Sequence, residues 1–286
     1  MKQKNIHWFP GHMVKAMRQI EERLKVIDII IEIVDSRAPI SSKNPFLEKI
    51  TQNKKRLLVF SKKDLCDENK VHNFINYYNN QNYSTTLCDL NNQNDIRKLI
   101  EKAFELGKDR QEKYLKRGMK PQPLRVMILG IPNVGKSTLI NRLCKRNAAS
   151  SRNTPGHTKA QQWVRINNQF ELLDTPGILP PHYEDEKISL HLAWIGSIKE
   201  NILPIDEIYT RLIEFLLLNY KDKLIERYDL KGELDDVSKV TEEIGKNRNL
   251  LLKGGVVDYD AVNKLVLREF KELLLKLANI SSNPIC

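Results

Sequence analysis

The first 180 residues carry short apolar runs separated by longer polar segments. Runs of this kind, rich in Ile and Val, are typical of strands buried on both faces of a parallel sheet. We expect strands at 26–35, 56–60, 83–87, 124–130, 162–166 and 170–174. Helical periodicity or charge patterning predicts helices at 69–80, 95–117 and 137–146. Pro, Ser and Asn mark 35–45 as a loop, and 118–123 reads as a linker.

From about residue 188 the apolar positions follow the helical period of 3.6 residues. We expect helices at 208–220, 221–228, 238–252 and 261–278, and Asp258 or Asp260 is suited to cap the last one. The predicted fold class is therefore α/β, with a mostly parallel sheet in a domain at 1–180. A small all-helical domain is expected at 181–286.

Charge is distributed unevenly along this basic chain. The 286 residues carry a net charge of +11. Residues 1–180 hold 32 Lys and Arg against 17 Asp and Glu, whereas residues 181–286 hold 15 against 19. A negatively charged partner should meet the first part, with RNA favoured over an anionic membrane or a free nucleotide. From charge alone, an ordinary solvated surface stays an equal alternative.

Two groups of basic residues are candidates for contact with an RNA backbone. One lies at 97–125 and the other surrounds residues 142–165. The first comprises Arg97, Lys98, Lys102, Lys108, Arg110, Lys113, Lys116, Arg117, Lys120 and Arg125, and the second Arg142, Lys145, Arg146, Arg152, Lys159 and Arg165.

Several function classes are disfavoured by what the sequence lacks. The four cysteines form no C-x-x-C pair, so the sequence suggests neither a zinc site nor a redox motif, and their scatter fits a reducing cytosol. The first residues contain no apolar stretch of the kind that a secretory signal needs. No run is long and apolar enough to span a bilayer. We expect a cytoplasmic protein without membrane association.

Residues 130–137 match the phosphate-loop pattern G-x-x-x-x-G-K-[ST] between a predicted strand and a predicted helix. Backbone N–H groups of such a loop converge on phosphate oxygens, and the helix N-terminus adds a positive dipole end. Lys136 would reach the β- and γ-phosphates, and the Ser137 hydroxyl would bind Mg²⁺. The expected nucleotide contacts here are Gly130, Asn133, Val134, Gly135, Lys136, Ser137 and Thr138.

A second phosphate element, D-x-x-G, runs from Asp174 to Gly177 at the end of a predicted strand. Asp174 can hold the Mg²⁺ shell, and the Gly177 N–H can donate to the γ-phosphate. Thr158 is a candidate Mg²⁺ ligand from a loop that orders when the γ-phosphate is present.

The base-reading motif is expected at Ser61–Asp64, where another buried strand ends. The Asp64 carboxylate can accept from both N1–H and N2–H₂ of guanine, a donor pair that adenine lacks, and Lys62 would pack on the ring. GTPases usually have Asn at the position of Ser61. Because serine is shorter, we expect its bond to the phosphate loop to be weakened or missing. Cys88 and Asp89 lie where a second base-contacting loop would fall.

The order of these motifs is unusual, because the base-reading motif precedes the phosphate loop by about seventy residues. Joining the old termini and cutting the chain after D-x-x-G would give this order with the same sheet. The cut leaves the loop after Gly177 without a following strand, so a helical domain could hold it and move with the nucleotide state.

Five segments carry a resemblance to a known family: WFPGHM at 8–13, GIPNVGKSTLINRL at 130–143, QQW at 161–163, LLDTPGIL at 172–179 and the Gly-Gly stretch at 254–260. With them the chain resembles the ribosome biogenesis GTPase A family, the YlqF-type circularly permuted GTPases of bacteria, over nearly its whole length. The resemblance implies a cytoplasmic GTPase that binds GTP and GDP and acts late in assembly of the large ribosomal subunit. It also implies contacts with ribosomal RNA and proteins, stimulation of hydrolysis by the subunit, and a monomer off the ribosome.

Hydrolysis needs a group that positions water, and the position usually held by Gln is Ile178, which cannot bond water. We hypothesise that the His12 imidazole does so, since the permutation brings the N-terminal segment near the cut. The resemblance points the same way; from the residues alone, a structural His is equally compatible. Asn133 is a candidate ligand for K⁺ between the phosphates, as in potassium-stimulated GTPases. The expected catalytic residues are His12, Lys136, Thr158 and Gly177.

Two other functions remain open from the residues. A metabolic P-loop ATPase or kinase is disfavoured by Asp64 in its base-reading motif. A non-catalytic, nucleotide-dependent RNA-binding scaffold is disfavoured by Lys136, Ser137 and Asp174, but is kept open by Ile178.

Overall fold

A computed structural model of the chain describes residues 11–144, 162–166, 169–175, 177–180, 185–198, 204–232 and 234–272, apart from the side chains of 11–13, 162–164 and 174. The described residues fall into two compact units that divide between Glu184 and Asp185. That each unit is a separate folding domain, with the boundary after residue 180, stays a prediction.

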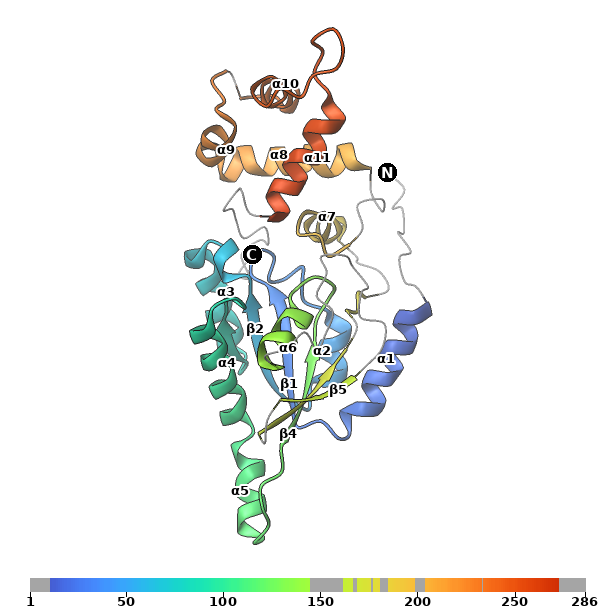
Figure 1. Ribbon diagram of the computed structural model, residues 1–286, viewed down its shortest axis with the longest axis vertical. Helices are drawn as coiled ribbons and strands as arrows, with labels where there is room; N and C mark the ends of the chain where they lie inside the picture. Colours follow the sequence, from blue (N-terminus) through green and yellow to red (C-terminus); the bar gives the residue numbers. More distant parts are fainter. Residues whose placement is uncertain are drawn as a thin grey trace. The chain divides into compact units, whose positions relative to one another are not determined.

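The first unit alternates strands and helices (Figure 1). Its elements are α1 (Gly11–Leu24), β1 (Ile29–Asp35), α2 (Pro45–Thr51), β2 (Lys55–Ser61), the 3₁₀ helix η1 (Lys63–Leu65), α3 (Glu68–Asn80), β3 (Ser84–Leu87), α4 (Gln93–Leu106), α5 (Lys108–Lys116), β4 (Leu124–Leu129), α6 (Lys136–Cys144), β5 (Gln162–Arg165) and β6 (Phe170–Asp174).

The strands form one six-stranded sheet in the order β3-β2-β1-β4-β6-β5. All neighbours pair in parallel except β5 and β6, which are antiparallel. The predicted α/β class with a mostly parallel sheet is confirmed. The chain leaves β1 toward β2 on one side and returns to β4 on the other, so the order reverses between β1 and β4. In open sheets of this kind, ligands bind at the carboxyl ends of the strands beside such a reversal.

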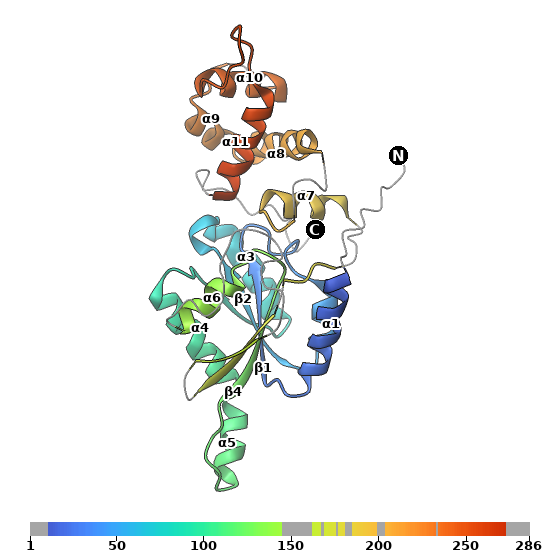
Figure 2. The same ribbon diagram turned by 45° about the vertical axis from the view of Figure 1, so that its right-hand side comes forward.

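Helices cover both faces of the sheet, as parallel strands require (Figures 1 and 2). On one face, Ile20 of α1 and Leu47 of α2 share an apolar cluster with Met127 of β4, and α3 packs on β1 and β2 through Phe74. On the other face, Leu99 of α4 lies among apolar side chains of the sheet and α6.

The sequence prediction missed three α-helices, one of which, Glu186–Trp194, lies in the second unit, and it merged two others. The regular helix α1 was not predicted, and α2 begins at the end of the predicted 35–45 loop. The single helix expected at 95–117 is wrong, because the chain breaks at Gly107 into α4 and α5. A Cβ on Gly107 would lie 2.3 Å from Leu124 Cδ1, so glycine permits a close approach of the break to the start of β4.

The second unit is helical, as predicted. It contains α7 (Glu186–Trp194), α8 (Ile205–Asn219), α9 (Lys221–Tyr228), α10 (Val237–Asn247) and α11 (Tyr259–Glu272). The helix expected at 238–252 instead ends at Asn247, where the chain turns into a bridge between Leu251 and Val257. Asp258 caps α11 by accepting from the Ala261 N–H at 3.0 Å, one of the two predicted alternatives.

A buried carboxylate joins two helices in this unit. Glu269 of α11 accepts from Arg227 Nε and Nη2 of α9 at 2.9 and 2.6 Å, and the Tyr228 hydroxyl donates to it at 2.9 Å.

Across the described part of the chain, no helix is both long and apolar enough to cross a membrane.

Candidate nucleotide site

The predicted motifs meet at one edge of the sheet. Ser61 ends β2, Cys88 follows β3, Gly130 follows β4 and Asp174 ends β6. Because these strands run parallel, their carboxyl ends share an edge, which lies at the reversal of strand order. Segments separated by more than a hundred residues therefore come together at this edge.

The phosphate-loop motif forms the turn between β4 and α6. Its φ angles are positive at Gly130 (151°), Asn133 (62°) and Gly135 (104°), so the backbone curls into a tight loop. Lys136 is 6% exposed, and its Nζ donates to the Ile131 carbonyl at 2.8 Å, which folds the ammonium across the loop. The other predicted contacts are the buried Val134 and the half-buried Ser137 and Thr138 in the first turn of α6.

The D-x-x-G segment lies directly against this loop. The Thr175 hydroxyl donates to the Ile128 carbonyl of β4 at 2.6 Å, which fixes the backbone next to Asp174. A Cβ on Gly177 would lie 2.7 Å from Pro132 Cα and 3.0 Å from Lys136 Nζ. Only glycine permits this approach, and it places the Gly177 backbone beside the phosphate-binding ammonium.

Ile178 points away from the site. Its side chain is 1% exposed and belongs to the same apolar cluster as Ala16 and Ile20 of α1. The residue that replaces the usual Gln is therefore part of the hydrophobic core. Through this cluster, α1 packs beside the segment that follows Gly177.

Ser61 corrects one expectation. We expected its bond to the phosphate loop to be weakened or missing, yet its Oγ lies 2.7 Å from the Val134 carbonyl and 2.9 Å from the Val34 carbonyl. The hydroxyl has one proton to share between the two acceptors. Serine makes this bond because the fully buried end of β2 runs close enough to the loop for a short side chain to reach.

Lys62 takes part in an ion-pair cluster that sequence reasoning missed. Its Nζ lies 2.8 Å from Asp35 Oδ2, and Arg37 donates to the same carboxylate through Nε at 2.9 Å and Nη2 at 2.7 Å. Burial alone would raise the pKa of Asp35, but the two cations outweigh it and hold the pKa well below its usual range. An acid at the end of a buried strand, followed two residues later by Arg, was the available signal.

The Lys62 backbone lies in the left-handed region, with φ 55° and ψ 45°. Asp64 follows on η1 and is exposed. Partial burial and the charge of nearby Asp89 raise the pKa of Asp64. The two predicted base loops are therefore close in space, with Asp64 open to a ligand.

The Cys88–Asp89 loop is held by its own bonds. Cys88 is buried and its N–H donates to the Phe60 carbonyl at 2.8 Å, while the Asp89 N–H donates to Asp95 Oδ2 at 2.9 Å. The following residue, Leu90, packs onto the phosphate loop, since a Cβ on Gly135 would lie 2.5 Å from Leu90 Cδ1. The predicted second base loop thus borders the phosphate loop.

Three of the predicted site residues are either not among the described residues or are described only in their backbones. Thr158 lies outside the described residues. The backbones of His12, in the first turn of α1, and Asp174, at the end of β6, are described, but their side chains are not. Their roles stay predictions.

The donor set suits Mg²⁺ bound mainly by phosphate oxygens. The Ser137 hydroxyl, at the start of α6, and Asp174, at the end of the paired strand β6, are hard oxygen donors at one edge of the sheet. Among the described residues no group of three or more His, Cys, Asp or Glu side chains could hold a metal alone.

Comparison with known proteins agrees with this geometry. A family model described as "RsgA GTPase" matches residues 29–183, and one described as "50S ribosome-binding GTPase" matches residues 125–252. The chain is 41% identical over 266 residues to ribosome biogenesis GTPase A of Bacillus cereus, covering 93% of this chain and 90% of that protein. The chain belongs to the ribosome biogenesis GTPase A family. It is a GTPase, and it binds GTP.

Two solved structures are similar over most of the chain. YlqF from T. maritima in a GNP-bound form has a TM-score of 0.63 at 25% identity, covering 90% of this chain and 94% of that one. Its GDP-bound form has a TM-score of 0.67 at 23% identity, covering 94% and 100%. The permuted GTPase fold predicted from motif order is confirmed.

Proposed function

We propose that this GTPase binds the large (50S) ribosomal subunit during late assembly and that the subunit stimulates its GTP hydrolysis. The observation that supports the proposal most is the meeting of Asp64, Lys136 and Gly177 at one sheet edge. That edge combines a guanine-reading carboxylate with two phosphate-sensing elements. The names of the matching families supply the ribosomal context.

In this proposal each site residue has a defined task. Asp64 accepts from the guanine edge, and Ser61 couples that motif to the phosphate loop through Val134. Lys136 and the Gly177 N–H bind the terminal phosphates. Mg²⁺, held by Ser137, Asp174 and Thr158 together with the nucleotide, would neutralise charge that develops on the phosphates.

The buried Ile178 leaves the water-positioning task to another group, for which we propose His12. Its helix α1 shares a core cluster with Ile178, so the N-terminal segment is near the segment that follows Gly177. K⁺ bound at Asn133 would supply further positive charge at the phosphates. His12→Ala should retain GTP binding and lose subunit-stimulated hydrolysis. A wild-type rate with subunits present would eliminate His12, and equal wild-type rates in Na⁺ and K⁺ would eliminate the potassium site.

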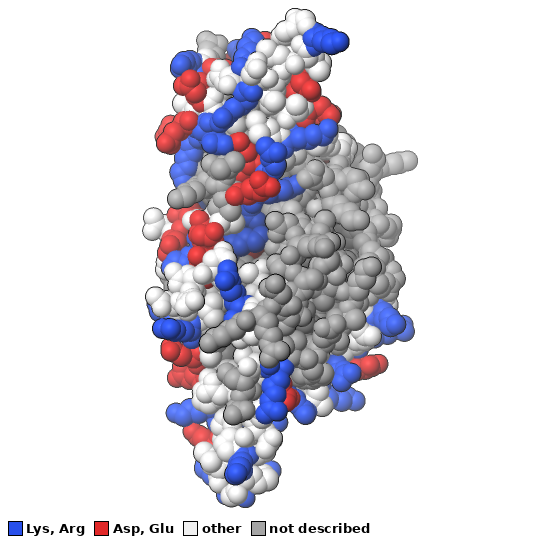
Figure 3. Space-filling view, viewed as in Figure 1, with Lys and Arg blue, Asp and Glu red and all other residues white. Residues whose placement is uncertain are grey.

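Helix α5 is the proposed RNA-docking surface. In Figures 1 and 2 it extends beyond the end of the sheet at which β4 begins, away from the nucleotide edge. None of its residues is buried, and Leu115 is 61% exposed. Figure 3 shows basic side chains on this projecting end. Lys113, Lys116 and Arg117 are exposed or half-exposed there, and phosphate contacts of this kind supply much of the affinity for RNA.

Not all of the predicted basic cluster is available for RNA. The Lys102 ammonium donates to the Thr85 carbonyl at 2.8 Å, and Arg110 pairs with Asp28. Both interactions fasten α4 and α5 to the sheet. The projecting helix is thus anchored at its base, and its far end presents the charge.

Co-sedimentation with purified large subunits tests the docking proposal. Lys113→Glu, Lys116→Glu and Arg117→Glu combined should weaken binding by about 10-fold or more and flatten its salt dependence. The control, Lys231→Glu, Lys239→Glu and Lys246→Glu, makes the same charge change in the helical unit and should bind nearly as the wild type does. Unchanged co-sedimentation of the α5 variant would refute the proposal that α5 docks on RNA.

We expect the protein to act in the cytoplasm, without membrane association, and as a monomer off the ribosome.

A further inference from the structure

Asn44 connects the start of α2 to the segment that follows Gly177, and it is not one of the predicted site residues. It is 1% exposed and N-caps α2, with its Oδ1 accepting from the Phe46 and Leu47 N–H groups at 3.0 and 3.4 Å. Its Nδ2 donates to the Ile178 carbonyl at 2.8 Å, across 134 residues of sequence. Because the cap occupies the oxygen, the amide can point only its nitrogen at Ile178.

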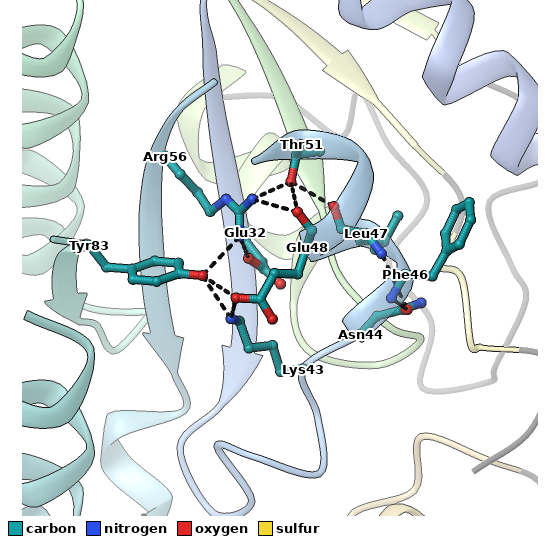
Figure 4. Close-up of polar contacts among 9 residues, drawn as sticks. All are labelled: Glu32, Lys43, Asn44, Phe46, Leu47, Glu48, Thr51, Arg56 and Tyr83. Atoms are coloured by element: carbon teal, nitrogen blue, oxygen red, sulfur yellow. Dashed lines mark hydrogen bonds and ion pairs between the residues drawn. The ribbon is translucent and has the colours of Figure 1, made fainter. Parts of the chain in front are cut away.

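The short helix that carries Asn44 is held by a polar network (Figure 4). Arg56 of β2 donates to the Glu48 carbonyl at 3.1 Å and to Glu32 of β1 at 3.3 Å. Lys43 and Tyr83 both bond the Glu48 carboxylate. Arg56 of β2 and Tyr83, next to β3, thus anchor the helix, so the Asn44 amide is fixed before any ligand arrives.

Ile178 is held from three sides. Its carbonyl accepts from Asn44, its N–H donates to the Gly130 carbonyl at 3.3 Å, and its side chain fills the core beside α1. The preceding residue, Gly177, lies against Pro132 and Lys136 of the phosphate loop. These bonds therefore fix the chain directly on the C-terminal side of Gly177.

We infer that Asn44 is a positioning residue for the γ-phosphate: its Nδ2 holds the Ile178 peptide so that the Gly177 N–H faces the terminal phosphate of GTP. The inference rests on the proposed role of Gly177. It assigns to the N-cap of α2 an indirect part in distinguishing GTP from GDP, because only the triphosphate has the oxygen that this N–H reaches. Asn44 itself touches no substrate.

The two functions of Asn44 can be separated by substitution. Asn44→Ser and Asn44→Asp keep an oxygen that caps α2 about as well as Asn does, but neither places an amide donor at Ile178. Asn44→Ala removes both functions. Asp236, which caps α10 by accepting from the Ser238 N–H at 2.8 Å, provides the control Asp236→Ser in the helical unit.

Affinities for a non-hydrolysable GTP analogue and for GDP, together with thermal melting, test the inference. Asn44→Ser should melt near the wild type, bind GDP normally and bind the GTP analogue about 3- to 10-fold more weakly, the effect of one hydrogen bond. Asn44→Asp should change the ratio of GTP-analogue affinity to GDP affinity at least as much. Asn44→Ala should show the same change together with a lower melting temperature. Asp236→Ser should leave the ratio unchanged.

An unchanged ratio of GTP to GDP affinity in Asn44→Ser would overturn the inference, whatever its melting temperature. Failure of the proposed function would look different. If the wild type did not prefer guanine nucleotides to ATP, or if Gly177→Ala left the affinity ratio intact, the assigned site itself would be wrong.

Discussion

The two units of the chain bury charged side chains for different purposes. In the sheet unit, Asp35 is bound by Arg37 and Lys62 on loops at the nucleotide edge. In the helical unit, Glu269 is bound by Arg227 and Tyr228 and joins α11 to α9. One cluster fixes a loop that can meet a ligand, and the other fixes the packing of helices.

The difference shows why these two ion pairs should respond differently to substitution. Removing one member of a buried pair leaves its partner without compensation, so both clusters should matter for stability. Only the Asp35 cluster includes a residue of the base-reading motif, Lys62, whose backbone is left-handed. A ligand readout therefore distinguishes them where a stability readout does not.

The largest effect is expected for Asp35→Asn. Arg37 and Lys62 would lose the buried charge that both contact, so we expect unfolding to become about 3–5 kcal/mol easier and nucleotide binding to weaken. Glu269→Gln should cost about 1–3 kcal/mol and leave GDP affinity unchanged. Urea unfolding and GDP titration of both variants measure the contrast. Equal losses of GDP affinity would remove the distinction between the clusters.

Lys136→Ala should come next. Loss of the ammonium at the phosphates should lower GTP turnover by about 100-fold or more, as loss of one preorganised charge-stabilising donor does. Lys264→Ala removes an exposed lysine that pairs with Asp260 in the helical unit, and it should keep wild-type turnover. Steady-state hydrolysis of both variants checks this, and a modest loss in Lys136→Ala would contradict the phosphate role.

Acid should weaken the helical unit before it weakens the sheet unit. Burial lowers the pKa of His191 to about 4; of the smaller influences, the charge of Asp185 raises it and the charge of Lys187 lowers it further. Below pH 6.5, the ordinary pKa of histidine, the unfolded chain binds a proton at His191 that the folded unit does not bind. The stability of the unit therefore falls as the pH decreases from 6.5 toward 4. The loss between pH 7 and 5 should be about 2 kcal/mol.

Asp35 behaves differently, because its lowered pKa preserves its contribution at every pH above the ordinary value of 3.8. In His191→Phe, the pH dependence of unfolding of the helical unit between pH 7 and 5 should largely disappear. Urea unfolding at several pH values, followed by signals from each unit, measures it. If the unfolding free energy of the helical unit still depended on pH to the same extent in His191→Phe, other titratable groups would be responsible for the effect.

The smallest contrast concerns two buried hydroxyls. Ser61→Ala removes the bond to Val134 and should weaken GDP binding by about 3- to 10-fold. Thr241→Val removes a buried hydroxyl that lies 2.7 Å from Tyr209 Oη in the helical unit, and it should lower stability without a change in GDP affinity. Normal GDP binding by Ser61→Ala would show that the base and phosphate motifs are not coupled through this hydroxyl.

The sequence was informative where chemistry is local. The phosphate loop, D-x-x-G and the base-reading motif each fit within a few residues, and their order predicted the permuted fold. The Asp258 cap and the strands at 162–166 and 170–174 were also local patterns, and the structure confirms them.

Long-range contacts were not readable in the same way. The Asn44 bond to Ile178 spans 134 residues, and 35–45 looked only like a polar loop. The break at Gly107 depends on a contact with Leu124, and the Ser61 bond depends on how closely β2 approaches the phosphate loop. Such features follow from the assembled sheet rather than from any one segment.

The most direct test is GTP hydrolysis by the purified protein in K⁺ buffer, with and without purified large ribosomal subunits, and with ATP as the control nucleotide. We predict strong stimulation by the subunit for GTP alone. Tight GTP binding without any stimulation would contradict the account and would point to a different activating partner.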